Sequence, residues 1–496
     1  MLPRGLLWTL AFALILFTGH SPYLSLPFFW DELGQYVPAA LDLYHDGSLV
    51  PHSAIPNVHP PGVMAWMAAT WSVVGYSVTA TRSAMLVLAS FGVFCAALLA
   101  KELRVPVVLA VLPLLADPLF FTQSMMAQLD MPAMVLGLAA LMLFLQQRHW
   151  ASALACCALV MCKETGIVLP LVLGGTLLLQ KKDRTLVIWY AIPFVLLAGW
   201  LMLLWRTTGS PLGDPAFAHY NTTYALHPVR MAAAFIRRAY YLFFADFRWV
   251  ATGSILYGLM HGVYRTAAWQ IVAAFALLHT VEVTVLGGAQ LERYLIPVLP
   301  LLYIAAAASW LRFNPVLRGA CAALLCVGLL AGLVLKPSFP FPYENSLAMV
   351  DFVELHRSAA RYLEQNYPGE TIHTAWPLTA ELGAPQFGYV QRPIRTAETS
   401  NLHYSTLNRL NPAQVRVLAM YSRDWDAGGW IATFPWATQF LAHYFEYERQ
   451  MTAEECIVKF GLVSVMRFER HGQWIEIYGP GKMARYYKDA EGSSHE

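Results

Sequence analysis

The most constraining feature of this sequence is a series of apolar segments along its first 335 residues. A helix needs about 20 mostly apolar residues to cross a bilayer, and a window of about this length indicates eleven candidates, several of whose apolar runs are shorter. They are residues 6–17, 78–100, 105–120, 131–145, 149–162, 166–179, 186–204, 249–260, 267–286, 295–311 and 316–335. Because 57% of the chain is hydrophobic and only 13% is charged, about half the usual charged share, a single soluble fold is excluded. We therefore expect a mainly α-helical, polytopic membrane bundle with about eleven crossings.

Basic residues divide unevenly between the loops that join these crossings. One alternate set of loops contains most of them, opposed only by Glu102 and Asp183. The basic residues of that set are Arg4, Lys101, Arg104, Arg148, Lys181, Lys182, Arg184, Arg265, Arg312 and Arg318. Because short loops rich in Lys and Arg stay in the cytoplasm, this set is predicted to be cytoplasmic. The amino terminus is then cytoplasmic, the carboxyl terminus lies outside, and most carboxylates face the outside.

Two long segments interrupt the pattern and define the expected domain organisation. Residues 1–335 form the predicted transmembrane domain, whose first outer loop, 21–77, far exceeds a usual helix connection. The apolar periodicity after Asp31 and the aromatic residues of 63–75 predict two interfacial helices in this loop. Residues 336–496 contain no further spanning run and are predicted to form a soluble, extracytoplasmic α/β domain. Its expected elements are a helix over 350–365, a strand over 371–376 and a hairpin of 463–468 with 474–478.

The overall charge indicates which classes of molecule this protein is expected to bind. The chain has 33 Lys and Arg residues against 31 Asp and Glu, a net charge of +2. Such a balance provides no broad basic surface, so nucleic acid is not expected as a partner and any basic site must be local. Membrane lipid is the partner that the apolar segments require.

Several short polar motifs occur on the outer side of the predicted bundle. Asp31 and Glu32 form an acidic pair directly after the first crossing. The other motifs are His59-Pro60-Pro61, Asp130 at the start of the fourth crossing, Lys163-Glu164-Thr165-Gly166 and Arg293-Tyr294-Leu295-Ile296-Pro297. Taken alone, the acidic pair has a structural interpretation, in which Asp31 caps the interfacial helix and Glu32 stabilises the positive end of its dipole.

In combination, these motifs resemble those of the polyprenyl-phosphate-sugar glycosyltransferases with the GT-C fold. The most similar groups are the dolichyl-phosphate-mannose protein mannosyltransferases and the bacterial lipid A aminoarabinose transferases. The resemblance covers about the first 335 residues. The large inserted domain of the eukaryotic mannosyltransferases has no counterpart here, where residues 206–248 stand in its place. The resemblance therefore implies a bacterial-type enzyme in the inner membrane, acting on its outer face.

The resemblance also assigns roles to individual residues. It implies that Asp31 is the catalytic base, that Glu32 and Asp130 belong to the same catalytic group, and that the donor phosphate is bound by the remaining motif residues. These phosphate-binding candidates are His59, Lys163, Arg293 and Tyr294. Such a reaction needs a carboxylate to take a proton from the acceptor hydroxyl and cations to stabilise the departing polyprenyl phosphate. The acceptor can be a protein, a lipid or a glycan.

Each assignment has an alternative. Asp130 can act as a helix cap, His59 can be a surface residue of the turn, and the cations of the later motifs can snorkel at helix ends. Arg237 and Arg238, on an amphipathic stretch, can instead contact anionic headgroups. Where the aminoarabinose transferases have an acidic metal ligand this chain has Val58, so the resemblance leaves the metal unknown and a divalent cation undecided.

Other functions remain open at this stage. An ion-coupled transporter or flippase of lipid-linked sugars could use Asp31, Asp130 and Glu164, although transporter charges are expected near the bilayer midplane and between internal repeats. A non-catalytic scaffold for the C-terminal domain would leave the outer charges unexplained. Lipid-linked-glycan polymerases and ligases share the donor class but lack the paired motifs of the first loop. Glycosyl transfer is therefore the favoured function.

Overall fold

The structure is a computed structural model that describes residues 4–180, 184–286, 289–335, 342–423 and 433–481. The chain divides into two compact units, which we call the helical unit and the mixed unit. The helical unit contains Met1–Ser25, Gln35–Pro337 and Glu344–Leu347, and the mixed unit contains Leu26–Gly34, Ser338–Tyr343 and Ala348–Glu496. The expected division into a transmembrane domain, 1–335, and a soluble domain, 336–496, stays a prediction.

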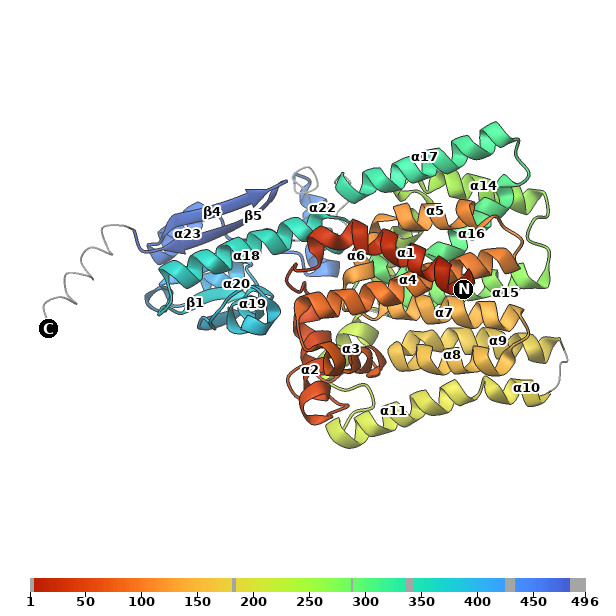
Figure 1. Cartoon of the computed structure of the whole chain (residues 1–496). Coiled ribbons are helices and arrows are strands. Elements are labelled where there is room, and N and C mark those ends of the chain that lie inside the picture. Colours follow the sequence, from red (N-terminus) through yellow and green to blue (C-terminus); the bar gives the residue numbers. More distant parts are fainter. Residues whose placement is uncertain (1–3, 181–183, 287–288, 336–341, 424–432, 482–496) are drawn as a thin grey trace, which may run out of the picture. The chain divides into compact units, whose positions relative to one another are not determined.

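The helical unit is built almost entirely from α-helices (Figure 1). They are α1 (Arg4–His20), α2 (Val37–Asp46), α3 (Gly62–Val74), α4 (Val78–Glu102), α5 (Val107–Ala116), α6 (Pro118–Met125), α7 (Asp130–Leu145), α8 (His149–Cys162), α9 (Val168–Leu179), α10 (Arg184–Trp189), α11 (Ile192–Thr208), α12 (Pro215–His219), α13 (Pro228–Phe243), α14 (Trp249–Met260), α15 (Ala267–Val285), α16 (Leu299–Trp310) and α17 (Pro315–Val334). The helices expected in the first outer loop are present as α2, preceded by the π-turn η2 (Glu32–Tyr36), and α3. The mainly α-helical class is confirmed.

Within the described residues, four helices are long and apolar enough to cross a membrane. They are Val78–Glu102, Thr185–Thr208, Ala267–Val285 and Pro315–Val334, and a bent pair formed by α5 and α6 would make five. Several other predicted crossings are shorter apolar helices; α7, for example, has 16 residues and is about 24 Å long, less than the 30 Å hydrocarbon core. The count of eleven crossings therefore stays a prediction.

The expected crossing over 105–120 is broken in the structure. Helix α5 ends at Ala116, and α6 starts at Pro118 at an angle of 71° to it. Pro118 has no N–H to donate and forces the preceding Asp117 into an extended conformation, so a continuous helix cannot pass this point. The Asp117 carboxylate caps the new helix by accepting a hydrogen bond of 3.0 Å from the backbone N–H of Phe120.

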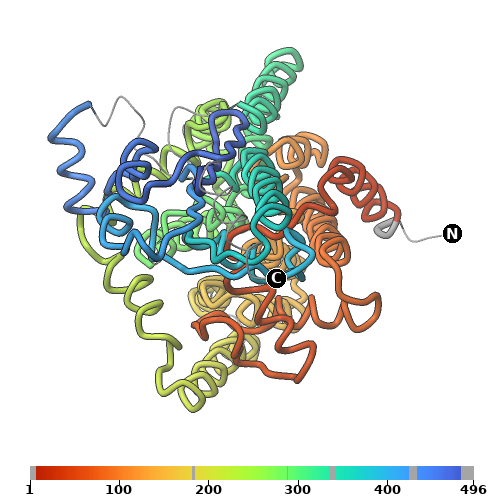
Figure 2. Tube along the Cα trace, turned by 90° about the vertical axis from the view of Figure 1, so that its left-hand side faces the viewer, coloured from red at the N-terminus to blue at the C-terminus, as the bar shows by residue number. Residues whose placement is uncertain are grey.

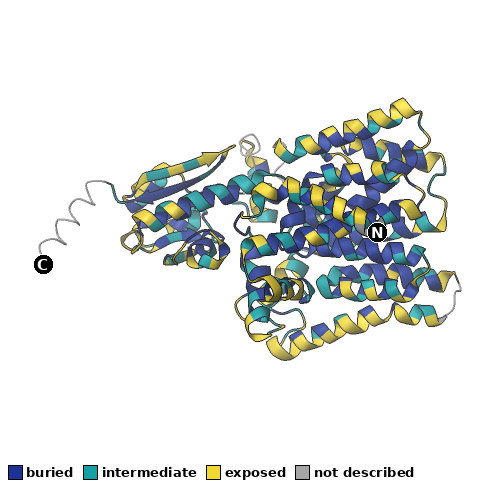
Figure 3. Cartoon of the chain, viewed as in Figure 1, coloured by how far each residue is buried: buried dark blue, intermediate teal, exposed yellow. Residues whose placement is uncertain are grey.

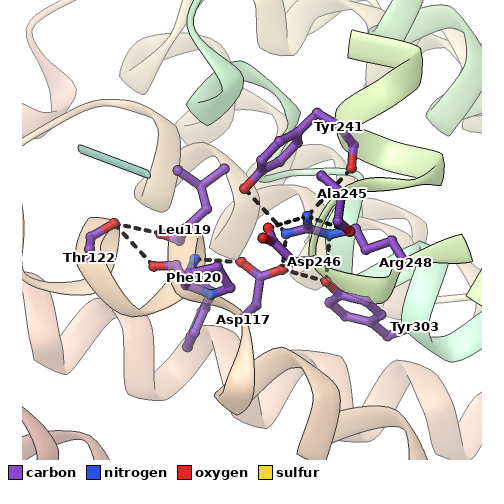
Figure 4. A network of polar contacts seen from close by, with 10 residues as sticks. Asp117, Leu119, Phe120, Thr122, Tyr241, Ala245, Asp246, Arg248 and Tyr303 are labelled. Atoms are coloured by element: carbon purple, nitrogen blue, oxygen red, sulfur yellow. Dashed lines mark hydrogen bonds and ion pairs between the residues drawn. The ribbon is translucent and has the colours of Figure 1, made fainter. Parts of the chain in front are cut away.

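A buried ion-pair network fixes this break in place (Figure 4). The Arg248 side chain donates through Nη2 to Asp117 at 2.7 Å and through Nη1 to Asp246 at 2.9 Å. Its Nε donates to the hydroxyl of Tyr303 on α16 at 3.1 Å, and Nη2 also contacts the hydroxyl of Tyr241. Every guanidinium nitrogen of this fully buried arginine thus has a partner, which ties the start of α6 to α13, α14 and α16.

The core of the helical unit is formed by α4 and α7, which pack closely together. The most apolar window of α4 is 67% buried, against 17% for Thr185–Thr208 and 22% for α17. Figures 1 and 2 place α11 and α17 at opposite edges of the bundle, and Figure 3 shows their exposed residues. Gly92 permits the α4–α7 contact, because a Cβ there would lie 2.8 Å from Val135. The apolar outer faces are those expected of helices in contact with lipid.

The mixed unit is a five-stranded sheet with helices. Its strands are β1 (Ile372–Ala375), β2 (Thr396–Thr399), β3 (Val417–Tyr421), β4 (Val463–Arg470) and β5 (Gln473–Gly479), in the order β2-β1-β3-β5-β4. The pairs of β1 are parallel and those of β5 are antiparallel. Its helices are α18 (Ala348–Asn366), α19 (Leu378–Gly383), α20 (Tyr404–Asn408), α22 (Pro435–Phe445) and α23 (Ala453–Phe460).

The local sequence accounts for the most regular parts of the mixed unit. Helix α18 covers the expected 350–365 helix and packs its apolar face on β4 and β5. The expected hairpin is β4–β5, whose two-residue turn places His471 at φ 45° and Gly472 at φ 79°. Two positive φ values are those of a type I′ turn, which matches the twist of paired strands. The location of this unit outside the cytoplasm stays a prediction.

Candidate active site

The His-Pro-Pro turn of the first loop is held against the end of α8. Gly62, directly after the turn, approaches so closely that a Cβ there would lie 2.4 Å from the backbone oxygen of Met161. This contact brings His59 to the segment that follows α8, where its Nδ1 lies 2.9 Å from Oε2 of Glu164. The aromatic rings of Tyr36 and Phe217 lie near the imidazole, at centroid distances of 6.1 and 6.0 Å. His59 is therefore fixed by packing and by an acidic partner.

Asp130, Lys163 and Arg293 come together at one buried point of the helical unit. Asp130 is the first residue of α7, Lys163 follows α8, and Arg293 lies in the 3-10 turn η6 (Glu292–Leu295) before α16. The ammonium of Lys163 donates to one oxygen of Asp130, and Nε of Arg293 lies 3.2 Å from the other. The ring of Tyr294 faces the Lys163 Nζ at 4.2 Å. Four of the predicted site residues, far apart in the sequence, thus form one cluster.

A second carboxylate in this cluster escaped the sequence analysis. Oε2 of Glu344 lies 2.9 Å from Nη1 of Arg293 and accepts a hydrogen bond of 3.4 Å from Gln128. Glu344 lies beyond residue 335 in a segment that packs with the helical unit, and its backbone oxygen accepts from the hydroxyl of Thr122 at 2.5 Å. Two nearby acids, Glu344 and Asp130, therefore neutralise Lys163 and Arg293. In the sequence, Glu344 is a single acidic residue outside any motif, so nothing indicated that it pairs with Arg293.

Helix α13 contributes two arginines with contrasting surroundings. Arg237 forms a buried ion pair with Glu292, which also accepts a hydrogen bond of 3.0 Å from Asn345. Its neighbour Arg238 is only 2% exposed, yet none of its three guanidinium nitrogens has a hydrogen-bond partner among the described residues. Both side chains are buried, so neither is arranged as the exposed headgroup contact considered from the sequence.

Among the described residues, Arg238 is the arginine of this cluster that contacts no carboxylate. The cations of Lys163, Arg293 and Arg237 are matched by three carboxylates, those of Asp130, Glu344 and Glu292. Burial lowers the pKa of Arg238 to about 10, although attraction to Glu292 and Tyr294 opposes this shift. The side chain stays protonated at neutral pH. A buried guanidinium without hydrogen bonds is costly, so this arrangement favours the binding of an anion.

The acidic pair of the first loop belongs to the mixed unit. Glu32 is fully buried, and its Oε2 accepts a hydrogen bond of 2.7 Å from the backbone N–H of Phe29. Asp31 is partly exposed. The preceding Trp30 has a φ of 47°, a strained value for a bulky side chain, and its ring packs edge-on against Trp376 at 4.8 Å. Glu32 thus has a structural contact to the backbone and is fully buried, whereas Asp31 is only partly buried.

The residues described do not suit a metal ion. No group of three or more His, Cys, Asp and Glu side chains within the described part of the chain could hold one. Val58 stands where the resemblance leads us to expect an acidic metal ligand, and the acid that lies beside His59 is instead Glu164.

The helical unit consists of apolar helices, several of which are broken or too short to span a bilayer. They surround a buried cluster of cations and carboxylates, and this arrangement defines the class of fold. It is the GT-C fold of membrane glycosyltransferases. A solved structure with this fold is ArnT from Cupriavidus metallidurans bound to undecaprenyl phosphate, with a TM-score of 0.54 and 14% identity over 95% of this chain and 97% of that chain. ArnT in the apo state matches with a TM-score of 0.52 and 13% identity over the same shares.

A third structure, the archaeal oligosaccharyltransferase AglB from Archaeoglobus fulgidus, has a TM-score of 0.49 and 11% identity, over 84% of this chain and 69% of that chain. No known family model matches the sequence. No curated protein matches it either. At 14% identity the match to ArnT establishes a common fold, while the activity has to be argued from the chemistry of the site.

Proposed function

We propose that the protein is an integral-membrane glycosyltransferase that moves a sugar from a polyprenyl-phosphate donor to an acceptor hydroxyl. The reaction takes place on the outer face of a bacterial inner membrane. The observation that carries the proposal is the buried guanidinium of Arg238, whose three nitrogens have no hydrogen-bond partner among the described residues. An anionic phosphate group would supply the missing hydrogen bonds together with a negative charge.

The donor class follows from the surroundings of that cation. A phosphate attached to a long apolar chain can leave the chain in lipid while its charged head enters the helical unit. The structure that shares this fold, ArnT, was solved with undecaprenyl phosphate. In this chain we assign the phosphate to Arg238, Lys163 and Arg293, with His59 and Tyr294 shaping the pocket around it. Asp130 holds two of the cations in position through its ion pairs.

In the proposed reaction Asp31 accepts the proton of the acceptor hydroxyl. The hydroxyl oxygen attacks the anomeric carbon, and the bond between that carbon and the phosphate oxygen breaks. The electron pair of the broken bond stays on the phosphate, whose charge increases by one. Cations held before the reaction stabilise this added charge without reorganisation, which is the usual source of such rate enhancement. The residues present provide for every proton and charge in this sequence.

The proposal is tested by substituting the acidic pair. Asp31→Asn keeps the size of the side chain but removes the base, so turnover should fall by about 10²–10⁴. Glu32→Gln is the matched control, because its amide oxygen can still accept the hydrogen bond from Phe29. The assay is the formation of undecaprenyl phosphate from a panel of undecaprenyl-phosphate sugars by the purified protein in proteoliposomes. Equal, mild effects of the two substitutions would contradict a catalytic Asp31.

The same assay addresses the transporter alternative. A glycosyltransferase forms undecaprenyl phosphate and a glycosylated product without a proton gradient. A flippase moves the intact lipid-linked sugar and leaves its glycosidic bond unbroken. Movement of intact donor that depends on a proton gradient, with no release of undecaprenyl phosphate, would overturn the proposed reaction.

A further inference from the structure

A small pocket in the mixed unit is lined by residues that the reaction described above does not use. Its volume is about 170 Å³, equal to about six waters in the liquid, which suits one sugar residue and not an extended ligand. The lining comes from the loop of the acidic pair, the ends of β1 and β3 and the segments near them. The lining residues that matter to the inference are Trp30, Trp376, Tyr421, His403, Asn401 and Arg423.

One side of the pocket is aromatic and is held rigidly. The rings of Trp30 and Trp376 pack edge to face, with centroids 4.8 Å apart, and both side chains are only partly buried. The hydroxyl of Tyr421 donates to the backbone oxygen of Trp376 at 2.6 Å, which ties β3 to this corner. Flat aromatic surfaces of this kind pack well against the C–H faces of sugar rings. Trp30 has a strained φ of 47°, as residues held in place by their surroundings often do.

The other side of the pocket is polar and carries one positive charge. Arg423 donates through Nη2 to the backbone oxygen of Glu448 at 2.5 Å and through Nη1 to Nε2 of His403 at 3.2 Å. Because Nε2 of His403 accepts this hydrogen bond, the imidazole is neutral, and burial together with the charge of Arg423 lowers the pKa of His403. The Nε of Arg423 is buried and has no hydrogen-bond partner among the described residues. Among the described residues, none that lines the pocket carries a carboxylate.

We infer that this pocket binds one saccharide residue of the acceptor and that Arg423 favours a residue with a negatively charged group. The sugar ring stacks on the aromatic side, and its carboxylate or phosphate lies against the guanidinium of Arg423. The inference rests on the proposed function, because the pocket adjoins the base through the chain itself: Trp30 lines it, and Asp31 is the next residue. Consecutive Cα atoms are about 3.8 Å apart, so an acceptor bound at Trp30 lies beside the loop that carries Asp31.

The test uses the full-length protein in detergent and three small probes: glucuronate, glucose and inorganic phosphate. Saturation-transfer NMR measures the binding of each. Glucuronate should bind saturably and at least about tenfold more tightly than glucose, as expected for one charge-assisted hydrogen bond. Arg423→Gln should remove this preference, and Trp376→Phe should weaken both sugars while the preference stays. The controls are Arg416→Gln and Trp436→Phe, at positions that are 63% and 70% exposed on the same unit and should change nothing.

Two results would overturn the inference. Inorganic phosphate that displaces glucuronate at equal concentration would show a simple anion site, and unchanged sugar binding in both pocket variants would show that the sugars bind elsewhere. If Arg423→Gln fails to fold, Trp376→Phe still tests the aromatic side. The inference and the proposed function fail separately, since glucuronate binding without turnover of any lipid donor contradicts only the function, and turnover without saccharide binding contradicts only the pocket.

Discussion

Two buried arginines of the helical unit, ten residues apart in the sequence, have opposite surroundings. Each nitrogen of Arg248 has a partner, and these partners include the carboxylates of Asp117 and Asp246. The three nitrogens of Arg238 have no hydrogen-bond partner within the described chain. A guanidinium with all its hydrogen bonds filled contributes to the fold, whereas an unfilled one imposes a desolvation cost that folding does not repay. We therefore infer that Arg248 stabilises the fold and that Arg238 binds a ligand.

The same substitution at the two positions should therefore have opposite effects on stability. Arg248→Met leaves Asp117 and Asp246 without their shared cation, and the loss of one partner of a buried ion pair costs about 3–5 kcal/mol. We expect a large drop in the thermal unfolding temperature of the purified protein in detergent. Arg312→Met, at an exposed arginine, is the control and should leave the temperature unchanged. If Arg248→Met unfolded at the wild-type temperature, the contrast between a structural Arg248 and a ligand-binding Arg238 would be wrong.

Lys163 should show an intermediate effect, because it combines both roles. Lys163→Met leaves Asp130 with Arg293 as its remaining cation, so we expect a loss of about 1–3 kcal/mol in unfolding free energy together with reduced donor turnover. Adding Asp130→Asn removes the weakened carboxylate and should restore part of the stability but none of the turnover. Strictly additive losses in the double variant would mean that the two side chains are not coupled.

A smaller effect is expected where the backbone alone positions the site. Gly62→Ala places a methyl group against the carbonyl of Met161, which cannot move away without shifting α8. The cost should be about 1–3 kcal/mol, and the turn should move His59 away from Glu164, so turnover falls as well. Gly175→Ala, in the interior of α9 with nothing near the added carbon, is the matched control and should be neutral or slightly stabilising. Equal effects of both substitutions would mean that the turn tolerates rearrangement.

The sequence alone predicted much of the local structure and little of the long-range pairing. Helix α4, helix α18 and the β4–β5 hairpin follow from apolar periodicity and turn residues, which act over a few positions. The break at Asp117 was missed because the apolar run continues through Pro118. Partners such as Asp117 and Arg248 are 131 residues apart, and nothing in a single sequence joins them.

The sequence predicted some residues of the candidate site and missed others. Asp130, Lys163, Arg293 and Tyr294 were selected by their resemblance to family motifs, and the structure brings these four together. Their roles in catalysis and phosphate binding stay predictions. The unfilled hydrogen bonds of the buried Arg238 were not foreseen, because an Arg-Arg pair on an amphipathic helix is typical of a lipid-facing surface. Only the three-dimensional arrangement distinguishes a paired arginine from an unfilled one.

The most direct test of the account is the binding of undecaprenyl phosphate to wild type and to Arg238→Met. Loss of one charge-assisted contact to the phosphate is worth about 2–4 kcal/mol, so the affinity should fall by about 30- to 700-fold. The variant should unfold at the same temperature as wild type or higher, because an unsatisfied buried charge has been removed. Unchanged affinity in Arg238→Met, or a loss of stability like that of Arg248→Met, would contradict the claim that this arginine is held for the donor.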